Sequence, residues 1–159
     1  MRFILFIIII LIFSCQDNDL EINQGTKKHV ILGVDNFISN YLDLVQGKNV
    51  GLLTNPSGVN HSLKSTIDLL YNNPSVNLIA LLSPEHGISG EIYAGEKISD
   101  SRDTQKDIPI YSVYNKKSES LSKILTKMDI VIIDIQDIGI RSYTYISSMA
   151  RIMRASVKN

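Results

Sequence analysis

The chain has 159 residues, a formal net charge of zero from 16 basic and 16 acidic side chains, and one cysteine. That length suffices for one globular domain with a buried core. The balanced charge, without a basic run, argues against a nucleic-acid-binding protein, and a single cysteine excludes a disulfide within the chain.

The first 15 residues have the pattern of a bacterial lipoprotein signal peptide. Arg2 supplies a positive charge, and an unbroken apolar run extends from Phe3 to Phe13. The run is shorter than the roughly 20 apolar residues of a membrane-spanning helix, but it suits the apolar core of a signal peptide. It ends at Ser14-Cys15, which resembles a lipobox. An ordinary signal peptide with a chance cysteine is the alternative.

We therefore expect Cys15 to become a lipidated N-terminus that anchors the protein on the periplasmic or outer-membrane side of a membrane. Residues 16–28 are polar and acidic and are predicted to form a flexible tether. The folded domain is predicted over residues 29–159.

Apolar runs alternate with helical patterns along that domain. Continuous apolar runs are typical of strands in a sheet covered on both faces, and alternation with helices predicts parallel strands joined by crossovers. The sequence therefore predicts an α/β, Rossmann-like three-layer domain with a mainly parallel sheet, and no convincing element between Gly87 and Pro109. The expected strands are 50–54, 76–82, 108–113 and 130–133, and the expected helices are 34–45, 62–72, 118–128 with Ser118 as N-cap, and 146–153.

Three polar clusters each follow an expected strand directly, at residues 54–58, 83–87 and 134–141. In open parallel sheets, ligands bind outside the carboxyl ends of the strands. We therefore expect the three clusters to lie at one edge of the sheet and to converge on a functional site.

Glu85 and His86 are the strongest candidates for functional residues in these clusters, since Pro84 and Gly87 hold their backbone in a tight turn. A carboxylic acid at this place can act as a general acid if burial raises its pKa. In the alternative interpretation, Glu85 caps the next element and His86 binds a backbone carbonyl.

The cluster after the last strand offers further polar groups. Asp134 and Asp137 are either functional or serve as helix caps paired with Arg141. Arg141 can clamp a ligand carboxylate, and Tyr143 and Tyr145 can stack on a sugar ring unless one of them packs in the core. The sequence has neither a phosphate-binding glycine fingerprint nor zinc-ligand spacing, so no cofactor and no metal are predicted.

Several segments, taken together, resemble the NamZ-type exo-β-N-acetylmuramidases. They occur in order over residues 31–153: GKNVGLLTNPSGV (47–59), STIDLL (65–70), LLSPEHGISG (81–90), AGEKISDS (94–101), IPIYSVY (108–114) and DIQDIGIRSYTYISSM (134–149). The resemblance implies a Rossmann-like N-terminal domain, a second domain after it, and an active site between the two. It implies a glycosidase of cell-wall recycling that releases N-acetylmuramic acid from the non-reducing end of peptidoglycan fragments.

The resemblance also implies roles for individual residues. Glu85 is the favoured catalytic carboxylate, with general-acid chemistry, and an arginine in the cleft suits the lactyl carboxylate of muramic acid. Glycoside hydrolysis usually needs a second carboxyl group, for which Glu96, Asp134 and Asp137 remain open. We expect catalysis by Glu85, His86 and Asp137, and substrate binding by Asn55, Glu96, Asp134, Arg141 and Tyr143.

The family is more than twice as long as this chain. We therefore expect this chain to be a fragment that lacks the second domain. Such a fragment would hold half of an active site, and we do not expect it to be a complete enzyme by itself. Two alternatives stay open. One is a metal-assisted hydrolase that uses His86, Glu85, Asp134 and Asp137, and the other is a non-catalytic, lipid-anchored sugar-binding module.

Overall fold

A five-stranded sheet lies at the centre of the computed structural model, which describes residues 30–157. Its strands are β1 (Asn49–Thr54), β2 (Asn77–Ser83), β3 (Ser101–Asp103), β4 (Ile108–Ser112) and β5 (Ile130–Asp134). They are arranged in the order β3-β4-β2-β1-β5. All neighbouring pairs are parallel except β3 and β4.

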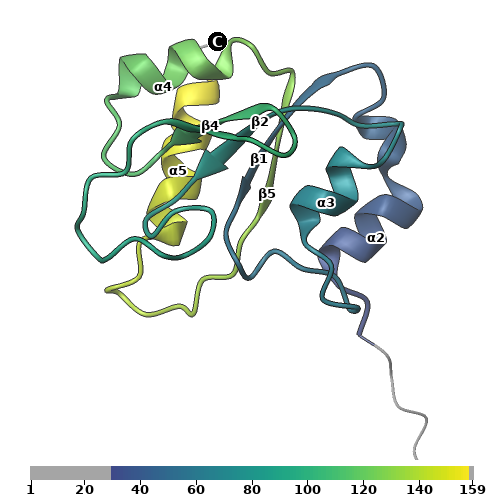
Figure 1. The fold of residues 1–159 in the computed structure, drawn as a ribbon, viewed down its shortest axis with the longest axis horizontal. Coiled ribbons are helices and arrows are strands. Elements are labelled where there is room, and N and C mark those ends of the chain that lie inside the picture. Colours follow the sequence, from purple (N-terminus) through teal and green to yellow (C-terminus); the bar gives the residue numbers. More distant parts are fainter. Residues whose placement is uncertain (1–29, 158–159) are drawn as a thin grey trace, which may run out of the picture. The chain divides into compact units, whose positions relative to one another are not determined.

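Helices cover both faces of this sheet (Figure 1). They are α2 (Gly33–Asn40), α3 (Thr66–Tyr71), α4 (Ser118–Leu125) and α5 (Tyr145–Ser156), with a short 3-10 helix, η1 (Leu42–Leu44). The pair α2 and α3 lies on one side of the sheet, and the pair α4 and α5 lies on the other (Figure 1). The predicted three-layer α/β fold with a mainly parallel sheet is confirmed.

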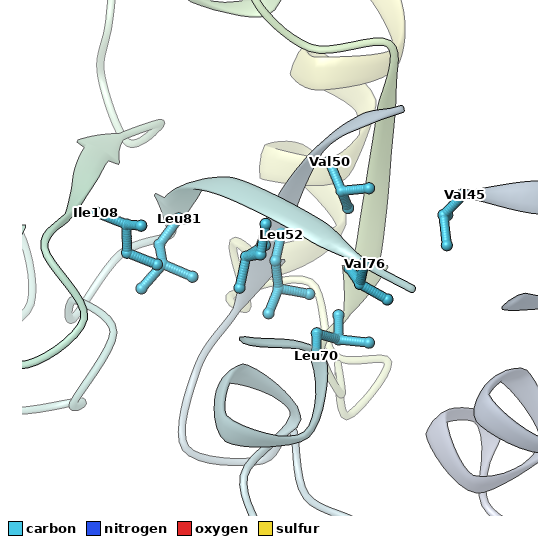
Figure 2. Close-up of a cluster of buried hydrophobic side chains, with 8 residues drawn as sticks. Val45, Val50, Leu52, Leu70, Val76, Leu81 and Ile108 are labelled. Atoms are coloured by element: carbon cyan, nitrogen blue, oxygen red, sulfur yellow. The ribbon is translucent and has the colours of Figure 1, made fainter. Parts of the chain in front are cut away.

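The unbroken apolar runs of β1 and β2 reflect burial on both faces. Successive strand residues point to opposite faces, so Leu52 and Leu81 join the core under α3, whereas Leu53 and Leu82 join the core under α4 and α5. Figure 2 shows the first of these clusters, with Leu70 of α3 beneath the sheet. Each such leucine contributes about 1.5–3 kcal/mol when fully buried.

β5 differs from these inner strands. All five of its residues are half-buried, and among the described residues β5 pairs with β1 alone. It is therefore an edge strand in residues 30–157, although its sequence, Ile-Val-Ile-Ile-Asp, is as apolar as that of an inner strand.

The predicted helix boundaries need three corrections. Residues 34–45 form two elements, because Tyr41 leaves the helical region and a 3-10 turn follows. The helix predicted from residue 62 begins at Thr66, because the side chain of Asn60 accepts hydrogen bonds within a preceding turn and Ser65 caps the helix. The N-cap of α4 is Lys117, not Ser118.

One element was missed, the short strand β3, which lies inside the segment predicted to lack structure. The predicted signal peptide, the lipidation of Cys15 and the tether over 16–28 fall outside the described residues and stay predictions. Within residues 30–157, no helix combines the length and the apolar character that crossing a membrane requires.

Candidate functional site

The strand ends that carry the polar clusters lie at one edge of the sheet. Thr54 at the end of β1 is in register with Asp134 at the end of β5. On the other side, Ser83 at the end of β2 is in register with Ser112 of β4. The expectation of a shared edge therefore holds, and the contacts made beyond the strands decide which residues meet.

The clusters after β1 and β5 contact each other directly. The backbone N–H of Gln136 donates a hydrogen bond to Ser57 Oγ over 3.0 Å. A Cβ on Gly58 would lie 2.1 Å from Thr54 Oγ1 and 3.1 Å from the carbonyl oxygen of Asp134, so only glycine fits there. These contacts link the two segments at the point between β1 and β5 where the strand order reverses, which is where doubly wound sheets usually bind ligands.

The cluster after β2 contains a buried carboxylate, that of Glu85, which is 7 % exposed. Its Oε2 accepts a hydrogen bond of 2.6 Å from the hydroxyl of Thr144, which precedes α5. Its Oε1 accepts one of 3.1 Å from the backbone N–H of Gly95, in the long loop before β3. The hydroxyl of Tyr114, just after β4, is a further hydrogen-bond partner. Glu85 thus joins three segments that are distant in sequence.

These donors set the ionisation of Glu85. Burial is the largest single influence and raises the pKa of the carboxyl group. Hydrogen bonds from Thr144, Gly95 and Tyr114, with the nearby charge of His86, lower it and together outweigh burial, so the pKa lies below its ordinary value. The same contact raises the pKa of the Tyr114 hydroxyl. Among the described residues, the balance at Glu85 therefore favours the ionised carboxylate.

His86 has a strained backbone and a satisfied ring. Its φ of 71° lies in the left-handed region, which is uncommon for residues other than glycine and is often retained at functional sites. Nδ1 lies 2.8 Å from the carbonyl oxygen of Ile92 and donates a hydrogen bond to it. The alternative interpretation of His86, binding to a backbone carbonyl, is the one that the structure shows.

One recess is lined by Glu85 itself, and a second is lined by two of its partners. The first, of about 40 Å³, is lined by Glu85, His86 and residues 142–145, and it has room for a few water molecules only. The other, of about 520 Å³, is lined by residues that include Gly95 and Tyr114, two partners of Glu85. That volume lies within the range of small-molecule sites, ~300–1,000 Å³.

Each of the two aspartates after β5 has hydrogen-bond partners of its own. Asp134 Oδ2 contacts the hydroxyl of Thr66, the first residue of α3. Asp137 accepts hydrogen bonds from the N–H of Gly139 (2.8 Å) and of Ile146 in α5 (3.1 Å). Neither aspartate has a hydrogen bond or ion pair with Glu85 in the described part of the chain. The geometry of Asp137 is that of a helix cap.

Arg141 and the two tyrosines lie beside this cap. Arg141 is exposed and makes no ion pair among residues 30–157, so its predicted pairing with Asp134 or Asp137 is wrong. The rings of Tyr143 and Tyr145 meet edge to face at 5.1 Å. Tyr145 is buried in the core and Tyr143 is 37 % exposed, so Tyr143 alone of the pair can stack on a ligand.

Asn55 and Glu96 complete the predicted set. Asn55 is buried, and its Oδ1 accepts hydrogen bonds from both the N–H and the hydroxyl of Ser57. It therefore shapes the turn after β1. Glu96 is exposed and directly follows Gly95, whose N–H binds Glu85. Its carboxylate has no hydrogen bond or ion pair within the described residues.

The sequence reasoning missed Thr144, Gly95 and Tyr114. All three lie within the resembling segments, but none has a side chain or backbone pattern that marks it as a partner of Glu85. Threonine is favoured as a helix cap, but that preference does not indicate a contact with Glu85, and Thr144 makes no capping bond. In the part of the chain from 30 to 157, no group of three or more His, Cys, Asp or Glu residues is placed to hold a metal ion. The metal-assisted alternative therefore lacks a ligand cluster there.

Comparisons with known proteins place the chain among relatives that are much longer. It is 44 % identical over 138 residues to the peptidoglycan β-N-acetylmuramidase NamZ of Bacillus subtilis, covering 86 % of this chain and 33 % of that protein. Two crystal structures of DUF1343 family proteins from Bacteroides fragilis also match. One is 41 % identical with a TM-score of 0.71, covering 81 % of this chain and 32 % of the other. The second is 32 % identical with a TM-score of 0.62, covering 82 % and 32 %.

The chain thus spans about a third of the length of these relatives. The sequence model of the family described as exo-β-N-acetylmuramidase NamZ, N-terminal, matches residues 50–159. That stretch contains β2 to β5, all of β1 but its first residue, and Glu85 with all three of its partners. The predicted resemblance is confirmed, and the chain belongs to the NamZ exo-β-N-acetylmuramidase family, of which it carries the N-terminal part.

Proposed function

We propose that this chain supplies the Glu85-bearing part of an exo-β-N-acetylmuramidase, which releases N-acetylmuramic acid from the non-reducing end of peptidoglycan fragments. The proposal rests on the buried Glu85 carboxylate, which is fixed by donors from three segments at a small recess that it lines together with His86. The 44 % identity to a peptidoglycan β-N-acetylmuramidase supports the choice of substrate class.

The lowered pKa of Glu85 favours an ionised role at neutral pH. Glycosidases commonly pair one ionised carboxylate, which stabilises or attacks the oxocarbenium-like centre or activates water, with one protonated carboxylic acid. Glu85 suits the first of these roles. The proton for the leaving oxygen then comes from another group, and Glu96 is the sequence candidate whose carboxylate is not already engaged among the described residues.

The test is turnover of two substrates by the wild-type protein and by Glu85→Gln. One substrate is a natural disaccharide with terminal N-acetylmuramic acid, and the other carries a nitrophenol leaving group, which needs little protonation. A lost ionised carboxylate slows both substrates alike, by at least ~10²-fold, whereas a lost general acid spares the nitrophenyl substrate. The matched control is Glu119→Gln, an exposed residue in the first turn of α4.

Circular dichroism checks that both variants fold. Near-normal cleavage of the disaccharide by a folded Glu85→Gln protein would remove Glu85 from the mechanism. Absence of turnover by the wild-type chain, with sugar binding retained, would instead favour the non-catalytic binding module.

We further propose that the protein is a lipoprotein anchored through Cys15. The support is the apolar run from Phe3 to Phe13 that ends in Ser14-Cys15. More than one acyl chain at a single terminus gives stable membrane binding. Palmitate labelling and membrane fractionation test this, because Cys15→Ser should abolish both the label and the membrane association. Unchanged labelling of Cys15→Ser would contradict the proposal.

A further inference from the structure

The residue at the start of α5 departs from the usual behaviour of a helix cap. Thr144 occupies the N-cap position, where the side-chain oxygen of a threonine ordinarily accepts a hydrogen bond from an N–H of the first helical turn. Here Thr144 has φ −107° and ψ −4° and makes no such bond. Its hydroxyl instead donates to Glu85 Oε2 over 2.6 Å, across 59 residues of sequence.

The cap of α5 comes from elsewhere in the chain. Asp137 Oδ2 accepts the N–H of Ile146, the second residue of the helix, over 3.1 Å. Its Oδ1 accepts the N–H of Gly139 over 2.8 Å, which fixes the loop that carries the aspartate. A negative charge also interacts favourably with the positive end of the helix dipole. Asp137 therefore satisfies a helix terminus that Thr144 would otherwise have to satisfy.

Helix capping would use the Thr144 oxygen as an acceptor, whereas the contact with Glu85 uses its proton, and Thr144 makes only the second of these bonds. The proton of Thr144 is directed to a carboxylate, which makes a charge-assisted and therefore strong hydrogen bond. The other oxygen of Glu85 is held by the N–H of Gly95. With donors on both oxygens, the plane of the buried carboxylate is fixed relative to β2 and α5.

We propose that Thr144 is a positioning residue for Glu85, and that Asp137 supplies the cap of α5 that Thr144 does not make, rather than acting as a second catalytic carboxylate. The inference rests on the proposed function only where activity is measured. The titratable groups that face Glu85 are the hydroxyl of Tyr114 and the ring of His86, and both remain unchanged in the variants described next.

The first experiment compares Thr144→Val, Thr144→Ser and wild type. Valine keeps the shape but removes the donor, and serine restores it. We expect kcat to fall roughly 10- to 100-fold in Thr144→Val, the range of a lost hydrogen bond to a charged group, with KM little changed. We also expect the acidic limb of the pH profile to move to higher pH, and Thr144→Ser to stay close to wild type. Thr126→Val, at the exposed end of α4, is the matched control.

A second measurement does not depend on turnover. Nuclear magnetic resonance titration of the Glu85 carboxyl carbon reports its pKa in the wild type and in Thr144→Val. A higher pKa in Thr144→Val supports the positioning role whether or not the wild-type chain turns over substrate by itself. An unchanged pKa in a folded Thr144→Val protein overturns the positioning role, whatever the activity.

Asp137→Asn tests the other half of the proposal. Asparagine keeps an oxygen that can cap the helix but cannot transfer a proton, so we expect kcat within about threefold of wild type. If Asp137 were the catalytic acid or base, the loss would be ~10²–10⁴-fold. A loss of that size in folded Asp137→Asn, without a change in the Glu85 titration, would overturn the capping role.

Discussion

The ends of β2 and β5 lie at the same edge of the sheet, and each is followed by carboxylates, yet their surroundings differ. β2 is an inner strand between β1 and β4, whereas β5 is an edge strand in the described residues. Glu85 after β2 is buried and is held by donors that lie 10 and 59 residues away. Asp137 after β5 binds N–H groups only two and nine residues away.

The difference suggests how position in a sheet shapes the use of a carboxylate. A carboxylate behind an inner strand loses water, so it needs several donors to remain ionised. Those donors then fix its orientation, which is what a catalytic group requires. Asp137, after the edge strand, is half-buried and binds backbone groups close in sequence, whereas Asp134 at the end of that strand contacts Thr66, 68 residues away.

The largest expected effect tests the contrast between the two strands themselves. Leu82 of β2 is fully buried, whereas Ile133 of β5 is half-buried in the same core cluster. We expect Leu82→Ala to lower the free energy of unfolding by about 2–5 kcal/mol. Ile133→Ala should cost less, because part of its side chain is already in water. Urea denaturation measures both, and an equal loss would show that β5 is as tightly packed as β2.

The next effect concerns the cap of α5. Asp137→Ala removes the acceptor for Ile146 and should lower the free energy of unfolding by ~0.5–2 kcal/mol, the usual cost of a lost N-cap. Asp137→Asn should recover most of it. Thermal denaturation of the two variants and the wild type measures this effect. Equal stability of Asp137→Ala and wild type would show that Asp137 does not stabilise α5 as a cap.

A further prediction follows from the direction of the Glu85 pKa. Because the folded pKa lies below the unfolded value, Glu85 stabilises the fold fully above the unfolded pKa and loses that contribution as the pH falls through the folded pKa. Denaturation from about pH 7 to about pH 3 should show a shallower loss of stability for Glu85→Gln than for wild type. Asp68, whose pKa is also lowered, contributes in both proteins and cancels in the difference. A steeper loss in the variant would mean that burial dominates at Glu85.

The strands were largely predictable because β1, β2 and β5 carry apolar side chains on both faces, whatever their neighbours do. β3 could not be predicted, since its three polar residues form a strand only by pairing with the edge of β4. The start of α3 was missed for a local reason, the turn built around the side chain of Asn60. The pattern of apolar residues does not show that competition.

The site was predictable to a similar depth. Glu85 could be found from its place after a strand, as could the shared edge, because both follow from topology. The ionisation of Glu85 could not be predicted, because it depends on Thr144 and Gly95. These residues contact Glu85 only in the folded chain. Asp134 and Asp137 looked equivalent to Glu85 in sequence because all three are carboxylates close after a strand, and the sequence does not show which hydrogen-bond partners each one meets in the fold.

The smallest effect on stability is expected at Arg141. This residue lies in the loop after β5 and so tests the comparison between the residues that follow β2 and those that follow β5. Its guanidinium makes no ion pair or hydrogen bond among residues 30–157, although Asp134 and Asp137 lie close in sequence. We expect Arg141→Ala to change the free energy of unfolding by less than ~0.5 kcal/mol, as for most exposed residues. Arg154→Ala, an exposed arginine in the last turn of α5, is the matched control.

If Arg141 binds the lactyl carboxylate of muramic acid, Arg141→Ala should raise KM for substrates that carry this group, while Arg154→Ala should not. A substrate with N-acetylglucosamine in place of N-acetylmuramic acid lacks the carboxylate, so its KM should be insensitive to Arg141→Ala. A marked loss of stability in Arg141→Ala would mean that the arginine pairs with the aspartates after all. Equal KM changes for the two sugars would separate Arg141 from recognition of the lactyl group.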